Sequence, residues 1–220
     1  MNTERFAYLP PTGDIEYLYV DDFLIAVNKP SGLLSVPGRG EDRQDCLIHR
    51  VQQQYPDVLS VHRLDMSTSG IMLLARGPEI QSHVSWLFMN RKVDKRYLAV
   101  VDGLMETAEG EIDLPLICDW PNRPKQKVDF EIGKKSLTRF RRISCDALTH
   151  SSRVELEPIT GRSHQLRVHL ASLGHPILGD EFYAGEAEGK ADRLLLHATD
   201  LSLPHPSTAE TIRFHSAAPF

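Results

Sequence analysis

The chain has 220 residues, 41% of them hydrophobic and 25% charged, with a formal net charge of −5. These values are typical of a globular protein with one sizeable core, and they argue against an indiscriminate nucleic-acid binder. No apolar run approaches the length of a membrane span and no export signal is visible at the N-terminus, so we expect a cytoplasmic protein without membrane contact.

The charges are unevenly distributed. Residues 121–142 contain eight Lys/Arg against two acidic residues, and residues 90–96 contain four against one. Acidic residues gather in residues 1–24 and 179–192. This distribution suits a polyanion bound on one face, although a solvated charged surface gives the same composition.

The first half of the chain predicts strands and two helices. EYLYVDDFLIAVNKP, residues 16–30, reads as a β-hairpin around its Asp-Asp pair, and an irregular loop follows it. Residues 43–55 predict a short helix, and GIMLLA, residues 70–75, predicts a fully apolar strand. Residues 77–93 predict a helix because their apolar side chains recur at helical spacing.

The second half is richer in strands. We expect strands at residues 96–103, 136–144, 152–159, 193–203 and 211–216. Because strands outnumber helices and do not alternate regularly with them, the pattern predicts an α+β fold. Its sheet should be mixed and largely antiparallel, flanked by helices and loops.

The clearest helix follows PITGRSHQLRVHLASLGHP, residues 158–176. Ser163 can cap it, Leu166, Leu170 and Leu173 form the apolar stripe, and Gly174 ends it. Polar side chains occupy both flanks: Arg162, Gln165 and His169 on one, His164 and Arg167 on the other. This helix end is either a site for an anion or an RNA backbone, or the polar flank of a surface helix.

Several kinds of site are not supported. The ten histidines and three cysteines lack the spacing of a metal site, and the odd, scattered cysteines lack a disulfide framework. Neither a P-loop, a GxGxxG fingerprint nor a GxSxG serine motif is present. We therefore expect no metal and no nucleotide cofactor.

The segment VHRLDMSTSG, residues 61–70, carries the most distinctive charges. In an extended segment Arg63 and Asp65 lie on one side, and His62 and Leu64 on the other. Taken alone, Asp65 is better explained by a local turn or cap formed with Ser67 than by a functional carboxylate, because most aspartates before Ser/Thr runs are local caps.

Five ordered blocks resolve this ambiguity by resemblance. NKPSGLLSVPG (28–38), HRLDMSTSGIMLLA (62–75), KRYLAVV (95–101) and GRSHQLRVHLASLGHPILGD (161–180) resemble the RluA family of pseudouridine synthases. DLPLICDWPNRPKQKV (113–128) is similar to the corresponding segment of the founding member. The resemblance runs from about residue 17 to the end of the chain, and it implies the pseudouridine synthase fold with a catalytic cleft across the sheet.

The resemblance also implies a chemistry. Enzymes of this family detach uracil from C1′ of a uridine in RNA, rotate it and rejoin it through C5, without a cofactor or metal. Asp65 matches the aspartate that acts on the sugar, either by attacking C1′ or by assisting elimination to a glycal. Arg167 matches its cationic partner, which would keep the carboxylate ionised in an apolar pocket, and Tyr97 matches the tyrosine that stacks on the target base.

RNA contacts are implied around these residues. Arg63 matches an arginine that enters the stack vacated by the flipped nucleotide, a role suited to a planar guanidinium. Aromatic and basic residues of the segment CDWPNRPKQK would contact unstacked bases and phosphates. The implied RNA-binding residues are Arg63, Trp120, Arg123, Lys125, Lys127, Arg162 and His164. The role of Lys29 stays open.

The organisation that follows is an N-terminal extension, residues 1–16, and a single catalytic domain, residues 17–220, without an S4 RNA-binding domain. The implied substrates are uridines in structured loops of tRNA, in the anticodon stem-loop, and of large-subunit rRNA, with no required protein partner evident. Two rivals are a non-catalytic RNA-binding or ribosome-assembly protein with the same fold and a metal-dependent hydrolase of nucleic acid. The second would need a carboxylate and histidine cluster that the sequence does not supply.

Overall fold

The computed structural model describes residues 8–220, so part of the predicted extension, residues 1–7, lies outside the described residues. One sheet contains β1 (Glu16–Val20), β2 (Leu24–Lys29), β3 (Val58–Ser60), β4 (Ser69–Arg76), β5 (Asp94–Asp102), β6 (Glu109–Asp113), β9 (Leu137–Asp146), β10 (Ser151–Pro158), β11 (Leu196–Pro204) and β12 (Thr211–His215). A separate hairpin is formed by β7 (Leu116–Cys118) and β8 (Gln126–Val128). The helices are α1 (Leu47–Gln52), α2 (Pro78–Met89), α3 (Gln165–Ser172) and the short 3-10 helices η1 (Glu41–Arg43), η2 (Trp120–Asn122) and η3 (Gly185–Lys190). Within residues 8–220 none of the helices is long and apolar enough to cross a membrane.

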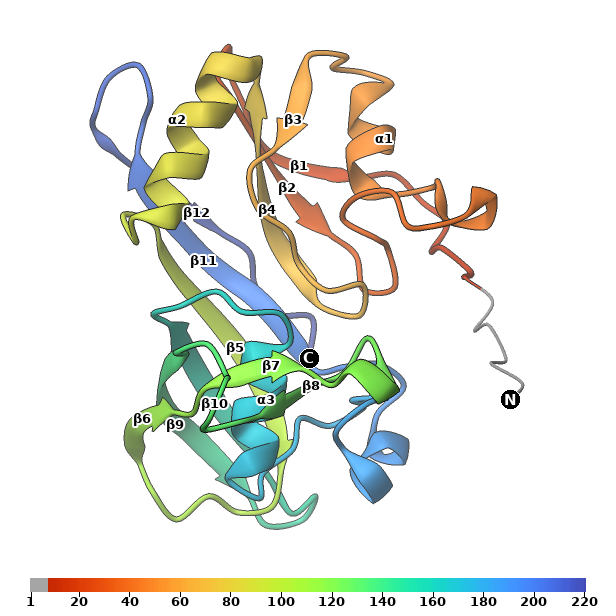
Figure 1. Ribbon diagram of the computed structural model, residues 1–220, viewed down its shortest axis with the longest axis vertical. Helices are drawn as coiled ribbons and strands as arrows, with labels where there is room; N and C mark the ends of the chain where they lie inside the picture. Colours follow the sequence, from red (N-terminus) through yellow and green to blue (C-terminus); the bar gives the residue numbers. More distant parts are fainter. Residues whose placement is uncertain (1–7) are drawn as a thin grey trace.

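The strand order is β1-β2-β4-β11-β5-β10-β9-β6, with β3 paired to β4 and β12 paired to β11. Only the β4–β11 pair is parallel among the strands that the structure describes. This arrangement confirms the predicted α+β class and the mixed, largely antiparallel sheet. Figure 1 shows two halves, one with α1 and α2 and the other with α3 and the β7–β8 hairpin, joined by the long strands β5 and β11.

Strand β4 explains why GIMLLA is continuously apolar. Ile71 and Leu73 pack into a core cluster that includes residues of α2, whereas Met72 and Leu74 pack into a second cluster that includes residues of α1. Successive side chains of a strand point to opposite faces, so β4 is covered on both. The strand therefore forms a rigid support directly after the segment that carries Asp65.

The β4–β11 pair brings the backbones unusually close. Gly70 has φ of +111°, and a Cβ atom there would lie 2.3 Å from the carbonyl oxygen of Ala198. A side chain cannot be accommodated in that space or readily in that conformation. Gly70 is therefore required where the two halves of the sheet meet.

Helix α3 is more deeply buried than its polar flanks predicted. Gln165, Arg167 and His169 are all less than 4% exposed. The Gln165 side-chain amide donates to the Leu137 carbonyl, and His169 hydrogen-bonds Thr138. The interpretation as a surface helix is wrong, because Gln165 and His169 find partners on β9, a distant part of the chain, and Arg167 pairs with Asp180.

Both ends of α3 also differ in detail from the prediction. His164, with φ of +52°, occupies the N-cap position, so the predicted Ser163 cap is wrong. Leu166 and Leu170 are buried as predicted, but Leu173 is 41% exposed because the helix ends one residue before it. Gly174, with φ of +81°, follows the helix end as expected for a left-handed C-terminal residue.

Candidate active site

A cleft of about 600 Å³ lies between the two halves of the sheet. Its walls come from the C-terminal end of α2 and the turn after it on one side, and from the β10–α3 loop on the other. The segment before β4 and strand β5 complete its lining. Six of the predicted site residues line it: Arg63, Asp65, Tyr97, Arg162, His164 and Arg167.

The segment before β4, residues 61–68, is named here the catalytic loop, and buried contacts hold it. The Ser35 hydroxyl donates to the Leu64 carbonyl and accepts the Leu64 N–H. His62 stacks on Phe88 of α2 at 4.6 Å and accepts the Leu73 N–H at Nε2. These contacts hold His62 and Leu64 in the alternation expected of an extended segment. Arg63 and Asp65, which alternate with them, face the cleft.

Lys29 also holds the catalytic loop in place. Its side chain is fully buried, and Nζ donates to the carbonyl oxygens of Pro30, Leu33 and Met66 at 2.8–2.9 Å. Burial lowers the pKa of this ammonium to about 7, and the negative charge of Asp65 opposes that shift. Lys29, whose role the sequence left open, therefore holds the backbone of Met66, the residue next to Asp65.

Asp65 lies at the base of the cleft with its side chain 26% exposed. Its Oδ2 is 3.7 Å from Nη1 of Arg167 and 4.0 Å from Nε2 of His164. The only local contact is the Asp65 backbone carbonyl, which accepts the Thr68 N–H. The carboxylate is thus not the cap of a local turn: in residues 8–220 it forms ionic contacts and accepts no hydrogen bond.

Arg167 is almost completely buried and is fixed by a second carboxylate. Its Nε and Nη2 donate to the two oxygens of Asp180 at 2.8 and 2.6 Å, and Nη2 is 3.2 Å from Glu181. Burial lowers the pKa of the guanidinium, but Asp180 and Glu181 more than offset this, so its pKa stays above the ordinary value. A permanent cation therefore faces Asp65 in a fixed orientation.

Tyr97 lies on β5, opposite Leu156 of β10 and Ala198 of β11. Burial raises the pKa of its hydroxyl, and the charge of Asp65 raises it further. The ring therefore stays a neutral phenol beside the carboxylate. An aromatic face in this position suits a stacked base.

Two arginines extend the cleft outward. Arg63 is exposed and forms no ion pair or hydrogen bond through its guanidinium within the described chain. Arg162 is also exposed, and its Nε donates to the Lys135 carbonyl. Both guanidinium groups are placed to contact a polyanion that enters the cleft.

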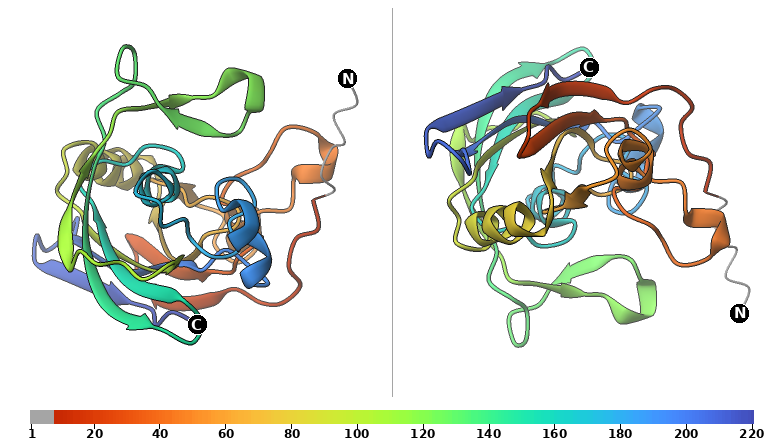
Figure 2. Two further views of the ribbon diagram at one scale, coloured as in Figure 1. Left: turned by 90° about the horizontal axis from the view of Figure 1, so that it is seen from below. Right: turned by 90° about the horizontal axis from the view of Figure 1, so that it is seen from above.

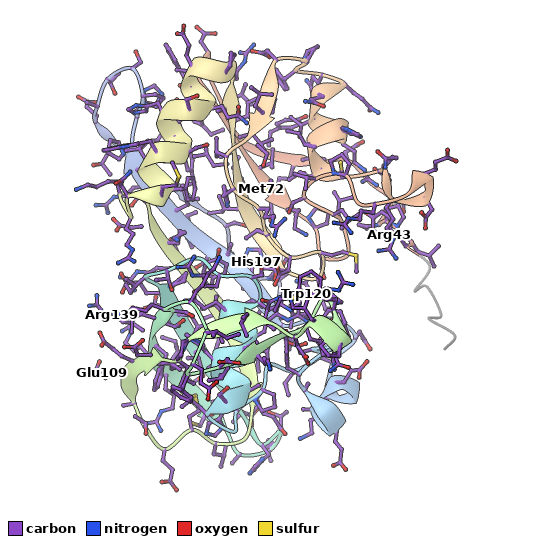
Figure 3. The ribbon with its side chains drawn as sticks, in the orientation of Figure 1. Arg43, Met72, Glu109, Trp120, Arg139 and His197 are labelled. Atoms are coloured by element: carbon purple, nitrogen blue, oxygen red, sulfur yellow. The ribbon has the colours of Figure 1, made fainter. Side chains whose placement is uncertain are left out.

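The basic β7–β8 hairpin projects from the sheet on the same side as α3 (Figure 2). Trp120 is 65% exposed at its turn (Figure 3), and the Arg123 guanidinium lies over its ring at 4.3 Å. Lys127 is 3.7 Å from Asp129, whereas Lys125 is half-buried. None of these four predicted RNA-binding residues lines the cleft, so the structure separates them from the six that do.

The sequence reasoning missed Asp180 and Tyr183. Asp180 orients Arg167, and the Tyr183 hydroxyl is 2.7 Å from Nδ1 of His164. Both belong to LGDEFY, residues 178–183: Asp180 ends the last block of the resemblance without a role assigned to it, and Tyr183 was noted only within the acidic residues 179–192. Within the described residues no group of three or more His, Cys, Asp or Glu side chains is placed to hold a metal ion.

Comparison with known proteins gives this geometry a family. The model of the RNA pseudouridylate synthase family matches residues 23–172. The chain belongs to that family and is an RNA pseudouridine synthase, an isomerase.

Particular relatives are similar over nearly the whole chain. The chain is 51% identical over 215 residues to the dual-specificity RNA pseudouridine synthase RluA of Escherichia coli (strain K12), covering 97% of this chain and 98% of that one. It is 54% identical over 206 residues to the protein of the same name from Vibrio parahaemolyticus, covering 91% and 82%. The solved structure of human RNA pseudouridylate synthase domain containing 1 superposes with a TM-score of 0.79 at 27% identity, over 96% of this chain and 87% of that one.

Proposed function

We propose that the protein converts uridines to pseudouridines in two kinds of structured RNA loop, the tRNA anticodon stem-loop and loops of large-subunit rRNA. Support comes from the dual-specificity relatives, which match almost the entire chain at about half identity. The exposed arginines at the cleft and the separate basic hairpin suit a folded RNA that spans both. Residues 17–220 act as one catalytic domain in this proposal, in the cytosol, where these RNAs are found.

The observation that carries the proposal is the environment of Asp65. Its carboxylate faces the cleft, lies 3.7 Å from the buried guanidinium of Arg167, and accepts no hydrogen bond within residues 8–220. Its oxygens are therefore available to a ligand and need not be released from a protein partner first. Such a carboxylate can attack a sugar carbon or remove a proton beside it.

The proposed reaction keeps the uridine atoms together. The bond from C1′ to N1 breaks, uracil turns within the cleft, and a bond from C1′ to C5 replaces it; C5 loses its proton and N1 takes one up, so the product is an isomer of the substrate. Asp65 acts at the sugar, Arg167 stabilises its charge, and the ring of Tyr97 supports the detached base. Both the attack on C1′ and the elimination route use these three groups.

The remaining predicted residues bind the RNA. Arg63 enters the stack that the flipped nucleotide leaves, and Arg162 and His164 contact the neighbouring backbone at the mouth of α3. Trp120, Arg123, Lys125 and Lys127 hold a more distant part of the same RNA. Flipping costs a few kcal/mol, so contacts outside the pocket must compensate for it.

The test is release of tritium from C5-labelled uridine in short stem-loops of tRNA and of large-subunit rRNA sequence. The wild-type protein should release tritium from both, and Asp65→Asn should lower the rate by more than about a thousandfold while the circular dichroism spectrum stays unchanged. Substantial turnover by Asp65→Asn contradicts the role of this residue.

Mapping pseudouridine in RNA from cells with and without the gene identifies the substrates. A difference in only one RNA class would reduce the proposal to that class. No difference in either class would favour the non-catalytic RNA-binding rival.

A further inference from the structure

The loop after α3, residues 179–183, gathers the groups that face Asp65. Gly179 has φ of +71°, and a Cβ atom there would lie 1.9 Å from the carbonyl oxygen of Arg193. The chain can therefore pass close to residue 193 and bring Asp180 into the protein interior, where its side chain is fully buried. Residues 179–183 are named here the support loop.

Asp180 links the shape of this loop to Arg167. Besides its two hydrogen bonds to Arg167, its Oδ1 accepts the N–H groups of Phe182 at 2.9 Å and Tyr183 at 3.2 Å. The two aromatic rings that follow are thereby held close to Arg167. Its guanidinium lies 5.1 Å from the centre of the Phe182 ring and 5.4 Å from that of the Tyr183 ring.

The same rings hold His164. Phe182 stacks on its imidazole with ring centres 5.6 Å apart and planes 11° apart. The Tyr183 hydroxyl lies 2.7 Å from Nδ1 of His164. These contacts direct the other ring nitrogen, Nε2, toward Asp65 at 4.0 Å.

The contacts of the Tyr183 hydroxyl favour one placement of the hydrogen atoms. The backbone N–H of Gln126, in β8, donates to the Tyr183 hydroxyl at 2.7 Å, and a backbone N–H cannot accept. The hydroxyl has a single proton to donate, and within residues 8–220 its other hydrogen-bond partner is Nδ1 of His164. When the hydroxyl donates this proton to Nδ1, a neutral imidazole carries its own proton on Nε2.

Burial favours the neutral form of His164. Burial lowers the pKa of its imidazole, the charges of Asp65, Asp180 and Glu181 oppose the shift, and Arg167 adds to it. The neutral ring then presents an N–H to Asp65. A closing movement of about 1 Å turns the present 4.0 Å separation into a hydrogen bond.

We propose that Tyr183 is a positioning residue: its hydroxyl holds His164 in the tautomer that points Nε2–H at Asp65, and it connects this arrangement to the RNA-binding hairpin through Gln126. The inference rests on the proposed role of Asp65. Strand β8 packs against α3 (Figure 1), and it carries the Gln126 N–H that orients Tyr183. RNA that contacts the hairpin therefore acts directly on this strand. Substrate binding at the hairpin is thereby coupled to the donor that faces Asp65.

The central test is Tyr183→Phe, which keeps the ring beside Arg167 and removes only the hydroxyl. We expect kcat for tritium release to fall about tenfold, equivalent to one or two lost hydrogen bonds, with KM for the stem-loop unchanged. The matched control is Tyr19→Phe, which removes a tyrosine hydroxyl that donates to Asp21 at 2.8 Å, outside the cleft. It should leave kcat unchanged.

A readout without RNA separates this role from a purely structural one. Nitrogen-15 NMR of the free protein should show His164 protonated on Nε2 in the wild type and a mixture of tautomers in Tyr183→Phe. The signals are assigned with His164→Asn, because asparagine tolerates the positive φ at this position. The double variant Tyr183→Phe/His164→Asn should be no slower than His164→Asn alone if both changes remove the same contact.

The outcomes that overturn the inference are distinct. If Tyr183→Phe leaves kcat and the His164 tautomer as in the wild type, or if the two substitutions reduce kcat independently, the proposal is wrong. If the wild-type protein releases no tritium from either RNA, the substrate proposal fails, while the tautomer measurement still decides the role of Tyr183.

Discussion

The catalytic loop and the β7–β8 hairpin are attached to the protein in opposite ways. Lys29 and Ser35 hold the catalytic loop from inside the protein, through buried hydrogen bonds to its backbone. The hairpin stands outside the main sheet, exposes Trp120 and Arg123, and contacts the support loop through Gln126. A group proposed to act on one atom needs a fixed position, whereas a surface proposed to bind RNA benefits from exposure.

Removing the buried support of the catalytic loop should have the largest effect. Lys29→Met leaves three carbonyl groups without their donor, so we expect the free energy of unfolding to fall by about 3 kcal/mol and kcat to fall about tenfold. Lys190→Met is the control, because its ammonium forms an exposed ion pair with Asp102, which contributes little to stability. Chemical denaturation and tritium release measure the two effects, and equal behaviour of the two variants would show that the loop does not depend on Lys29.

Arg63 and the hairpin lysines, Lys125 and Lys127, should contribute to RNA binding in different ways. Arg63→Ala should lower catalysis and leave the salt dependence of binding close to that of the wild type, because a guanidinium in the base stack neutralises no phosphate. Replacing Lys125 and Lys127 by Ala should lower the log–log salt slope by about one unit per lost phosphate contact and weaken binding to any RNA.

The measurements for this pair are RNA affinity against salt concentration and the fluorescence of 2-aminopurine placed beside the target uridine. Arg63→Ala should reduce the fluorescence rise that reports unstacking. A flatter salt slope with an unchanged fluorescence rise would make Arg63 an ordinary phosphate contact.

The buried anchoring of the catalytic loop also predicts a sensitivity to acid. Burial lowers the pKa of His62 to about 3, whereas an unfolded histidine takes up its proton near pH 6.5. The unfolded state thus binds an extra proton between these values, and stability is lost as the pH falls through them.

The variant His62→Gln retains an acceptor for the Leu73 N–H and does not titrate. Its unfolding free energy should depend less on pH between about 4 and 6, by about 1 kcal/mol per pH unit. The exposed imidazole of His83, on α2, is the control, since His83→Gln should behave as the wild type. Equal slopes for both variants would contradict the assignment to His62.

The smallest effect is expected from metal removal. Dialysis against a strong chelator should leave the rate unchanged with a stem-loop folded beforehand, since the proposed reaction uses only protein side chains. Loss of activity that one particular transition metal restores would contradict this expectation. Restoration by magnesium would reflect RNA folding.

Much of the fold was predictable because it depends on local patterns. The β-rich runs of β1 and β2 around their turn, the apolar run of β4 and the spacing in α2 each depend on neighbouring residues. The short strands β3, β6, β7 and β8 were missed, because segments of three to five residues are too short to show a periodic pattern. The burial of α3 was missed because its polar groups pair with Thr138 and Leu137, whose proximity only the tertiary structure creates.

For the site, the resemblance supplied roles that the residues alone did not. Asp65 by itself favoured a local turn or cap, whereas the structure brings it together with Arg167 and Tyr97 around one cleft. The pattern did not reveal how Arg167 is held. Asp180 and Tyr183 act through hydrogen bonds to residues 13 and 57 positions away, and no local period marks such partners.

The parallel pairing of β4 with β11 has a consequence for biosynthesis. Ser69 and His197, which hydrogen-bond across this pair, are 128 residues apart in the chain. At ordinary rates of translation, roughly ten seconds separate the appearance of these two residues. During that interval Asp65 already exists, but Leu196 of β11 is not yet available to the cleft lining. The lining of the cleft is therefore complete only after β11 has been made.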